Sequence, residues 1–228
     1  MKKDRVKLKS DSTRSVGARS MFGLSEKEFY VLKKLNTPQK IQDFLDTLPI
    51  NFEKGGDTCL SPRAVLREKK AHCIEGAMLA AVALWIAGER PLLLDFKTPP
   101  EDEDHVVALY KQNGYWGAIS KTNHAVLRFR DPVYRTTREL ALSYFHEYFI
   151  TDTGKKTLTS YSRPFSLARF GAKWITSEKN LWYIASSLDK SPHTKIVPKK
   201  NARLIRPVSK IERATFKLTE WTKKNPRT

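Results

Sequence analysis

The sequence predicts an α+β domain in which helices come first, antiparallel strands follow, and further helices come after the strands. Apolar residues recur at three- and four-residue spacing over residues 25–45 and again over residues 72–88. Strand-like runs separated by turn residues fill the stretch from residue 91 to residue 120. At 228 residues, with 40% hydrophobic and 11% aromatic residues, the chain can bury one core of ordinary size. We therefore expect one folded domain.

The net charge of +18 is concentrated at the two ends of the chain. Residues 1–20 carry seven Lys and Arg against two Asp, a net +5, and residues 195–228 carry eleven against two Glu, a net +9. Only +4 of the +18 is left for residues 21–194, so we expect a nearly balanced domain there between two basic tails. Such tails keep a protein in solution, or bind nucleic-acid phosphates weakly and without sequence preference. Aromatic residues are scarce in them, which favours the first role.

Three short helices are expected in the N-terminal third of the chain. The first spans residues 25–36, and Thr37-Pro38 begins the second. After the loop NFEKGGDTC, Ser61-Pro62 combines a serine cap with proline at the first helical position and predicts a third helix over PRAVLREKK.

The strongest helical pattern is HCIEGAMLAAVALWIAG, residues 72–88. Its apolar side chains cover most of the helix circumference, which predicts a helix at the centre of the domain. Gly88 supplies the stop, and Cys73 stands at the beginning.

The remaining elements follow from alternation, turn residues and helical spacing. They are, in order, strands at residues 91–96 (PLLLDF), 105–110 (HVVALY), 115–120 (YWGAIS) and 123–129 (NHAVLRF), a helix at residues 136–149 and a helix near residues 178–188. An acidic loop, Glu101 to Asp104, separates the first two strands. Its simplest interpretation is a solvated loop, and its functional one is a rim that selects basic or amine-bearing substrates beside His105.

The two middle strands form a hairpin whose register can be predicted. Asn113-Gly114 between strand-like runs is the strongest short hairpin signal, and with these two residues as the loop, paired positions sum to 227. His105 then faces Thr122, and Ser120 lies diagonally from His105 on the same face, roughly 7–8 Å away between backbones. We therefore expect Ser120 to contact His105.

Cys73 and His105 form the combination that could carry chemistry. The positive end of a helix dipole stabilises a thiolate, and Cys73 stands at that end. A nearby imidazole takes the thiol proton and later returns it to the leaving group, which makes His105 the best base. A helix that begins with Cys and packs on a strand that begins with His is the core of a papain-like site.

These residues resemble the transglutaminase-like superfamily, most closely its small bacterial transglutaminase-like cysteine proteinases. SPRAVL, HCIEGAMLAAVALWIAG, HVVALY and GYWGAIS carry the resemblance, within residues 59–122. Residues 37–161 as a whole resemble uncharacterised bacterial proteins of that superfamily. The resemblance implies a papain-like core, a Cys-His-Asp triad with Cys73 as nucleophile and His105 as base, and no cofactor.

The third position of the triad departs from the family pattern. The family has an Asp about four residues after a Trp on the next strand, whereas Ser120 stands four residues after Trp116 here. An Asp fixes the imidazole tautomer and stabilises the imidazolium, and a hydroxyl does only the first. Asp131 is the first substitute and Asn123 the second.

Several alternatives remain for single residues. His124 is a second choice for the working histidine. Cys59 lies in a loop and has a structural interpretation, and a metal site built from Cys59, His72, Cys73 and His105 fits no standard zinc spacing. Adjacent helix residues point about 100° apart, so His72 is interpreted as a rim or cap residue rather than the base.

The sequence therefore predicts a cysteine-dependent hydrolase that acts on a peptide or carboxamide through a thioester, with transamidation as a variant. The alternative is a catalytically degenerate module that binds or scaffolds, with its tails on nucleic acid or an acidic partner. The chain shows neither a secretory signal nor an apolar run of roughly 20 residues that could cross a membrane, so we expect a soluble cytoplasmic protein with free thiols.

Overall fold

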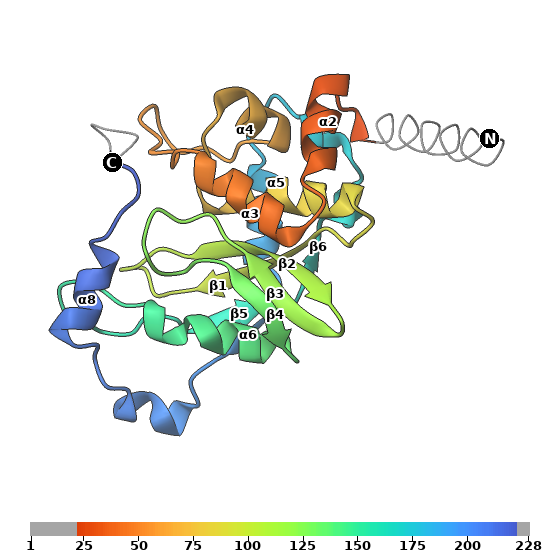
Figure 1. The fold of residues 1–228 in the computed structure, drawn as a ribbon. Coiled ribbons are helices and arrows are strands. Elements are labelled where there is room, and N and C mark those ends of the chain that lie inside the picture. The colour runs from red at the N-terminus through yellow and green to blue at the C-terminus, as the bar shows by residue number, and fades with distance from the viewer. Residues whose placement is uncertain (1–21, 223–228) are drawn as a thin grey trace.

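An antiparallel sheet with helices on both faces organises the computed structural model, which describes residues 22–222 (Figure 1). The strand order is β4-β3-β2-β1-β5-β7, and β6 pairs with β1 beside β5. The strands are β1 (Leu92–Lys97), β2 (His105–Gln112), β3 (Tyr115–Ile119), β4 (Arg130–Tyr134), β5 (Ser160–Ser162), β6 (Phe165–Ser166) and β7 (His193–Lys195). The α+β class predicted from the sequence is confirmed.

Four helices cover one face of the sheet, above it in Figure 1. They are α2 (Glu26–Lys34), α3 (Pro38–Thr47), α4 (Pro62–Glu68) and α5 (Cys73–Ile86). The side chains of Ser25, Thr37 and Ser61 each accept a backbone N–H of the first turn, which fixes where the first three helices begin. Helix α5 lies between the other three and the sheet, and it is buried from Ile74 to Leu84 because it is apolar all round.

The two faces of the sheet bury two separate cores. On β1 and β2, Leu93, Val106 and Ala108 pack with α5 in the larger core. The alternate residues face the other way and pack in the smaller core with helix α6 (Thr137–Tyr144), which lies below the sheet in Figure 1. Both sheet faces are therefore covered around β1 and β2.

The hairpin register agrees with the prediction. Ala108 pairs with Ile119 and Gln112 with Tyr115, so paired positions sum to 227. The loop residue Asn113 has φ 49° and Gly114 has φ 86°, the left-handed conformations that a two-residue hairpin turn requires. The end of β3 is thereby set opposite the beginning of β2.

The predicted strand at residues 123–129 is wrong. This segment is irregular and makes only an isolated bridge between His124 and Thr219, and β4 begins at Arg130. Its backbone groups bond the C-terminal segment, as Ala125 N–H does with the Leu218 carbonyl at 3.0 Å. Partners distant in sequence therefore replace a ladder with β3.

The later helices are shorter than predicted or shifted. Helix α6 ends at Tyr144 and continues as the 3-10 helix η1 (Phe145–Glu147), and helix α7 spans Trp182–Asp189. Two further 3-10 helices, η2 (Leu167–Phe170) and η3 (Lys173–Thr176), lie between β6 and α7.

The C-terminal segment predicted as a tail packs on the domain up to Thr222. It contains β7 from His193, the 3-10 helix η4 (Lys199–Leu204) and helix α8 (Lys210–Phe216). Ile196, Val208 and Trp221 are buried within it. Net charge did not reveal this because widely spaced apolar residues anchor the segment while its basic side chains stay exposed. The predicted N-terminal tail, residues 1–20, lies outside the described residues.

Within residues 22–222, every helix is too short or too polar to serve as a membrane-crossing segment.

Candidate active site

Cys73 is the first residue of α5 and stands at the positive end of the helix dipole. The residue before it, His72, is the N-cap and has extended backbone, with ψ at −171°. Cys73 is half-buried as a residue, its thiol is in no disulfide, and it lines two cavities. It therefore combines a stabilising position with access to ligands.

His105 begins β2 and is held by a hydroxyl from the neighbouring strand. Its Nε2 lies 2.8 Å from Ser120 Oγ, directly after β3, as the hairpin register predicted. Ser120 Oγ donates its own proton to the Leu127 carbonyl at 2.5 Å, so it can only accept from the ring. The tautomer of His105 with its proton on Nε2 is thus favoured, which leaves Nδ1 free to take a proton.

Ser120 is itself fixed by Gln42 of α3. The Gln42 side-chain amide accepts the Ser120 N–H at 2.9 Å and donates to the Ser120 carbonyl at 2.8 Å. Gln42 also donates to Asp46 at 2.8 Å. Sequence reasoning missed Gln42, although a polar residue between the core positions Ile41 and Leu45 was a usable signal.

The pKa of Cys73 is well below that of an ordinary thiol. Burial raises the pKa of the Cys73 thiol, but hydrogen bonds and charge from His105 and His72 outweigh burial and lower it to about 6. At neutral pH the sulfur is therefore mainly thiolate, the nucleophilic form.

His72 provides a positive charge beside the sulfur. Burial lowers the pKa of His72, but the hydrogen bond and charge of Cys73, together with the charge of Glu75, raise it to about 9. Its Nε2 lies 2.9 Å from the Thr58 carbonyl and 3.3 Å from Glu75. The cap interpretation of His72 is confirmed, but its contact with Cys73 was missed because an N-cap residue has extended backbone and does not follow the helical 100° rule.

Glu75 ties the loop before α4 to the first turn of α5. Its fully buried carboxylate accepts Thr58 Oγ1–H at 2.7 Å, Leu60 N–H at 2.9 Å and His72 N–H at 2.9 Å. Asn51 Nδ2 adds a bond at 3.2 Å. These bonds hold the loop before α4 against the first turn of α5, and the Thr58 carbonyl of that loop meets the His72 ring.

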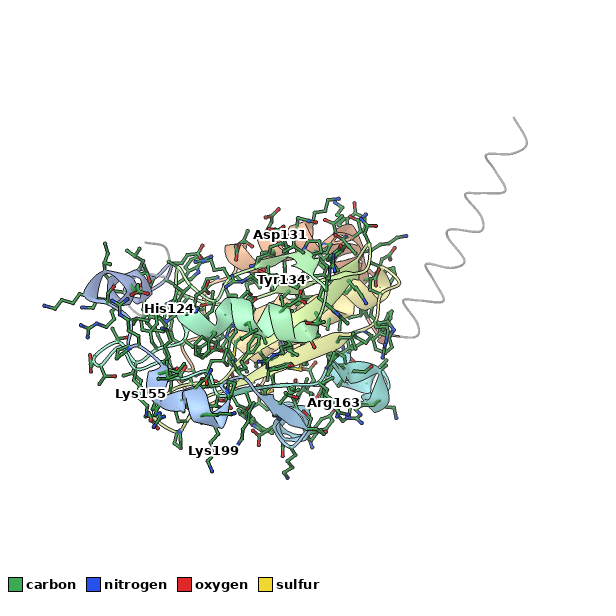
Figure 2. All side chains as sticks on the ribbon, turned by 90° about the horizontal axis from the view of Figure 1, so that it is seen from below. His124, Asp131, Tyr134, Lys155, Arg163 and Lys199 are labelled. Atoms are coloured by element: carbon green, nitrogen blue, oxygen red, sulfur yellow. The ribbon has the colours of Figure 1, made fainter. Side chains whose placement is uncertain are left out.

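The substitutes considered for the third position lie elsewhere. Asp131 is exposed on β4, and Figure 2 shows it apart from His124. Within residues 22–222 no hydrogen bond or ion pair joins it to His105, so its expected orienting role is corrected. The side chain of Asn123 is bonded to the backbone of Trp221 through both its oxygen and its nitrogen.

His124 shares the cavity of Cys73 but is engaged by the C-terminal segment. Its Nδ1 lies 2.7 Å from the Phe216 carbonyl, and its ring stacks on Phe216 at 3.9 Å between centroids. Burial lowers the pKa of His124. His105, rather than His124, contacts the thiol together with His72.

Cys59 has the surroundings of a structural thiol. It is fully buried, and burial raises its pKa to about 12. Its backbone is bonded to the side chain of Asn180 and to the N–H of Leu181. In the described part of the chain, no three His, Cys, Asp or Glu side chains are grouped so that they could hold a metal ion.

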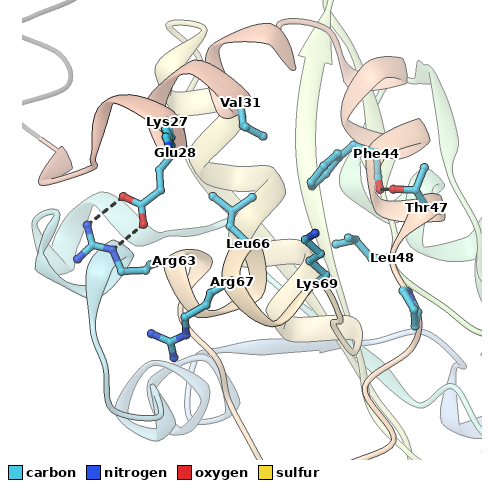
Figure 3. Close-up of a pocket in the computed structure, with 11 residues that line it drawn as sticks. Lys27, Glu28, Val31, Phe44, Thr47, Leu48, Arg63, Leu66, Arg67 and Lys69 are labelled. Atoms are coloured by element: carbon cyan, nitrogen blue, oxygen red, sulfur yellow. Dashed lines mark hydrogen bonds and ion pairs between the residues drawn. The ribbon is translucent and has the colours of Figure 1, made fainter.

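Two cavities meet at Cys73. The larger, of about 870 Å³, is lined by Cys73, His72 and His105 together with the acidic loop. The smaller, of about 480 Å³, is lined by Cys73, Asp95 and Trp182. A further cavity of about 790 Å³ lies between α2, α3 and α4, lined in part by Phe44 and Leu66, and does not include Cys73 (Figure 3).

Comparison of the chain with protein-family models and with curated proteins gives no match. The resemblance to the transglutaminase-like superfamily therefore stays a prediction. The function has to follow from Cys73, His72 and His105 themselves.

Proposed function

We propose that this protein is a cysteine-dependent amide-bond enzyme with a papain-like Cys–His arrangement, in which Cys73 is the nucleophile. The observation that carries the proposal is the thiol of Cys73 between two imidazoles, with its pKa lowered to about 6. A thiol with only a packing role is expected to have its pKa raised, as burial does for Cys59.

In this reaction the Cys73 thiolate is the nucleophile, and His105 is the group that gives and takes the proton. The sulfur attacks the carbonyl carbon of an amide, a C–S bond forms, and the carbonyl electrons move to the oxygen. The backbone N–H of Cys73, at the beginning of α5, would stabilise the developing oxyanion. His105 then gives its Nδ1 proton to the leaving nitrogen as the C–N bond breaks, which leaves a thioester.

Hydrolysis returns the enzyme to its starting state. Neutral His105 takes a proton from water, whose oxygen attacks the thioester carbon, and the sulfur leaves as thiolate. An amine in place of water gives transamidation by the same route, and we expect hydrolysis as the main outcome. His72 stays protonated throughout and stabilises the thiolate by charge.

Ser120 takes over one of the two tasks of an Asp. It selects the His105 tautomer, but it brings no negative charge to the imidazolium. The thiolate is then the principal counter-ion of His105 until it attacks. We expect slower turnover than a carboxylate-assisted site would give.

The same serine supports a second candidate function, a catalytically degenerate module that binds rather than cleaves. Ser120 in the usual Asp position is the observation in its favour. The two functions differ in whether product is formed.

A peptide library decides between them. We would incubate the protein with a proteome-derived peptide library and search by mass spectrometry for new amino termini, deamidated carboxamides and cross-linked peptides, using Cys73→Ala and His105→Ala as the controls. Products that depend on both Cys73 and His105 support the enzyme. Products equal in wild type and Cys73→Ala, or none in either, would favour the binding module.

A further inference from the structure

The cavities around Cys73 are acidic although the whole chain carries +18. Carboxylates line both sides of the thiol, and Asp104 borders both cavities. The acidic residues are Glu53, Asp57, Glu101, Asp102, Glu103 and Asp104 in the larger cavity, and Asp95, Asp104 and Asp189 in the smaller. Charge of this sign, gathered at the candidate nucleophile, favours a cationic ligand.

The lysines in these walls are already engaged. Lys121 is buried, and its ammonium donates to the carbonyls of Leu45 and Leu48 at the end of α3. Lys97 is bonded to both Asp104 and Asp189. His72 lies beside the sulfur, and it is held by Cys73 and Glu75. The carboxylates therefore outnumber the positive charges that face them.

Two of the carboxylates are free to meet a ligand. Within residues 22–222, the side chains of Glu103 and Asp57 make no hydrogen bond or ion pair, and both are exposed at the cavity wall. The neighbours of Glu103 are fixed, since Glu101 pairs with Lys155 at 2.8 Å and Asp104 accepts Thr98 N–H at 2.8 Å. Glu103 therefore projects from a loop that the bonds of its neighbours hold in place.

A second, independent feature of this cavity is the hydroxyl of Tyr148. The residue is 3% exposed, it lines the cavity, and its hydroxyl has no hydrogen-bond partner in the described part of the chain. Burial, with the negative charges of Cys73 and Asp102, raises its pKa well above the usual range, so it remains a neutral donor. A buried hydroxyl without a partner is destabilising, and a ligand oxygen in the cavity would supply the partner.

We propose, on the basis of the proposed function, that the substrate is an acyl compound with a cationic group near the scissile bond, such as a lysine- or arginine-containing peptide. Its carbonyl oxygen accepts the Tyr148 hydroxyl as the carbonyl carbon reaches Cys73. Its cationic group lies among Glu103, Asp57 and the rest of the acidic loop. Anionic substrates are excluded by the same charges.

The test uses small thiol reagents, so it does not depend on turnover. Second-order rates of Cys73 labelling are measured with 2-(trimethylammonium)ethyl methanethiosulfonate and with 2-sulfonatoethyl methanethiosulfonate, and peptide mapping confirms the labelled residue. Each rate is divided by the rate of the same reagent with 2-mercaptoethanol, which removes the difference in intrinsic reactivity between the two reagents. The ratio of the cationic to the anionic reagent then reports the charge of the cavity. The ratio cancels any change in thiolate fraction between variants.

We expect a ratio well above one that falls roughly two- to tenfold for each carboxylate removed in Glu103→Gln and Asp57→Asn. The matched control is Glu89→Gln, which removes an equal charge just beyond the far end of α5, about 20 Å from Cys73 and more than two Debye lengths away. Wild type and Glu89→Gln should agree.

A ratio near one, or one that Glu103→Gln and Asp57→Asn leave unchanged, would overturn the proposed substrate class. Such a result combined with a thiol pKa near 6 would leave the amide-bond enzyme standing. A high ratio combined with an ordinary thiol pKa would support the cation-binding cavity and overturn the enzyme.

Discussion

The Nε2 of His105 lies 2.8 Å from the hydroxyl oxygen of Ser120, whose proton is bonded to the Leu127 carbonyl. This arrangement explains why a carboxylate is absent from the third position. A carboxylate at residue 120 would have no proton to donate and would face the Leu127 carbonyl in repulsion. The loop of residues 123–129 and Ser120 therefore orient the His105 ring together.

Removal of the Ser120 hydroxyl should disorganise His105. Ser120→Ala leaves the buried Nε2–H and the Leu127 carbonyl without a partner, so we predict a loss of about 1–3 kcal/mol in the free energy of unfolding. The rate of Cys73 alkylation at neutral pH should fall about tenfold. Urea unfolding and iodoacetamide kinetics measure the two effects, with Ser120→Thr as the hydroxyl-retaining control. Equal behaviour of the Ala and Thr variants would contradict the assigned role.

Gln42 should act through Ser120 rather than through the thiol directly. In Gln42→Glu the side chain can still accept the Ser120 N–H but can no longer donate to its carbonyl, so a buried carboxylate faces a carbonyl oxygen. We predict a lower unfolding free energy and an upward shift of the Cys73 pKa. Gln39→Glu, on the exposed side of the first turn of α3, should leave the Cys73 pKa unchanged and should not lower the unfolding free energy. A Cys73 pKa in Gln42→Glu equal to that of the wild type would show that the hydrogen bonds between Gln42 and Ser120 are dispensable.

Cys73 and His72 predict a plateau in stability against pH. The folded pKa of Cys73, about 6, lies below the unfolded value of about 8.5, so its contribution is present above the unfolded value and is lost as pH falls through 6. The folded pKa of His72, about 9, lies above the unfolded value of about 6.5, so its contribution is present below 6.5 and is lost as pH rises through 9.

Between about pH 6.5 and 8.5, folding releases one proton from the Cys73 thiol and takes one up on the His72 imidazole, so the net proton uptake on folding is zero. We therefore predict that the stability difference between wild type and Cys73→Ser, measured by urea unfolding, is flat in this window and shrinks on both sides. In His72→Asn the Cys73 pKa should rise and the alkaline decline should disappear. A difference that rises steadily across the window would be inconsistent with the pair.

Tyr148 and Tyr144 predict opposite responses to the same substitution. Tyr148→Phe removes a buried hydroxyl without a partner in the described residues and should raise the unfolding free energy by about 1 kcal/mol or more. Tyr144→Phe removes a hydroxyl that donates to the Arg128 carbonyl at 2.9 Å and should lower it by about 1–3 kcal/mol. Thermal and urea unfolding of both variants give the comparison. A destabilised Tyr148→Phe would mean that its hydroxyl has a structural partner.

The parts of the site that follow from local rules were predictable from the sequence. Asn113-Gly114 set the hairpin register, and that register placed Ser120 against His105. The apolar pattern of α5 placed Cys73 at a helix start. Each inference needed only residues that are close in sequence.

The parts that rest on distant contacts were not predictable. Gln42 lies 78 residues before Ser120, and no local pattern links them. The C-terminal segment binds residues 123–125 through pairs about 90 or more residues apart, which turned a predicted strand into a loop. Tyr148 lines the cavity from just beyond η1, whereas the sequence predicted an unbroken helix over residues 136–149.

The most direct test of the central claim is the pKa of the Cys73 thiol, measured by the pH dependence of iodoacetamide alkylation in wild type and in His105→Ala, with Cys59→Ser in both. We predict a midpoint near 6 in wild type that moves toward about 8.5 when His105 is lost. An ordinary midpoint in wild type, or one that is indifferent to His105, would contradict a thiolate–imidazolium pair and with it the proposed enzyme.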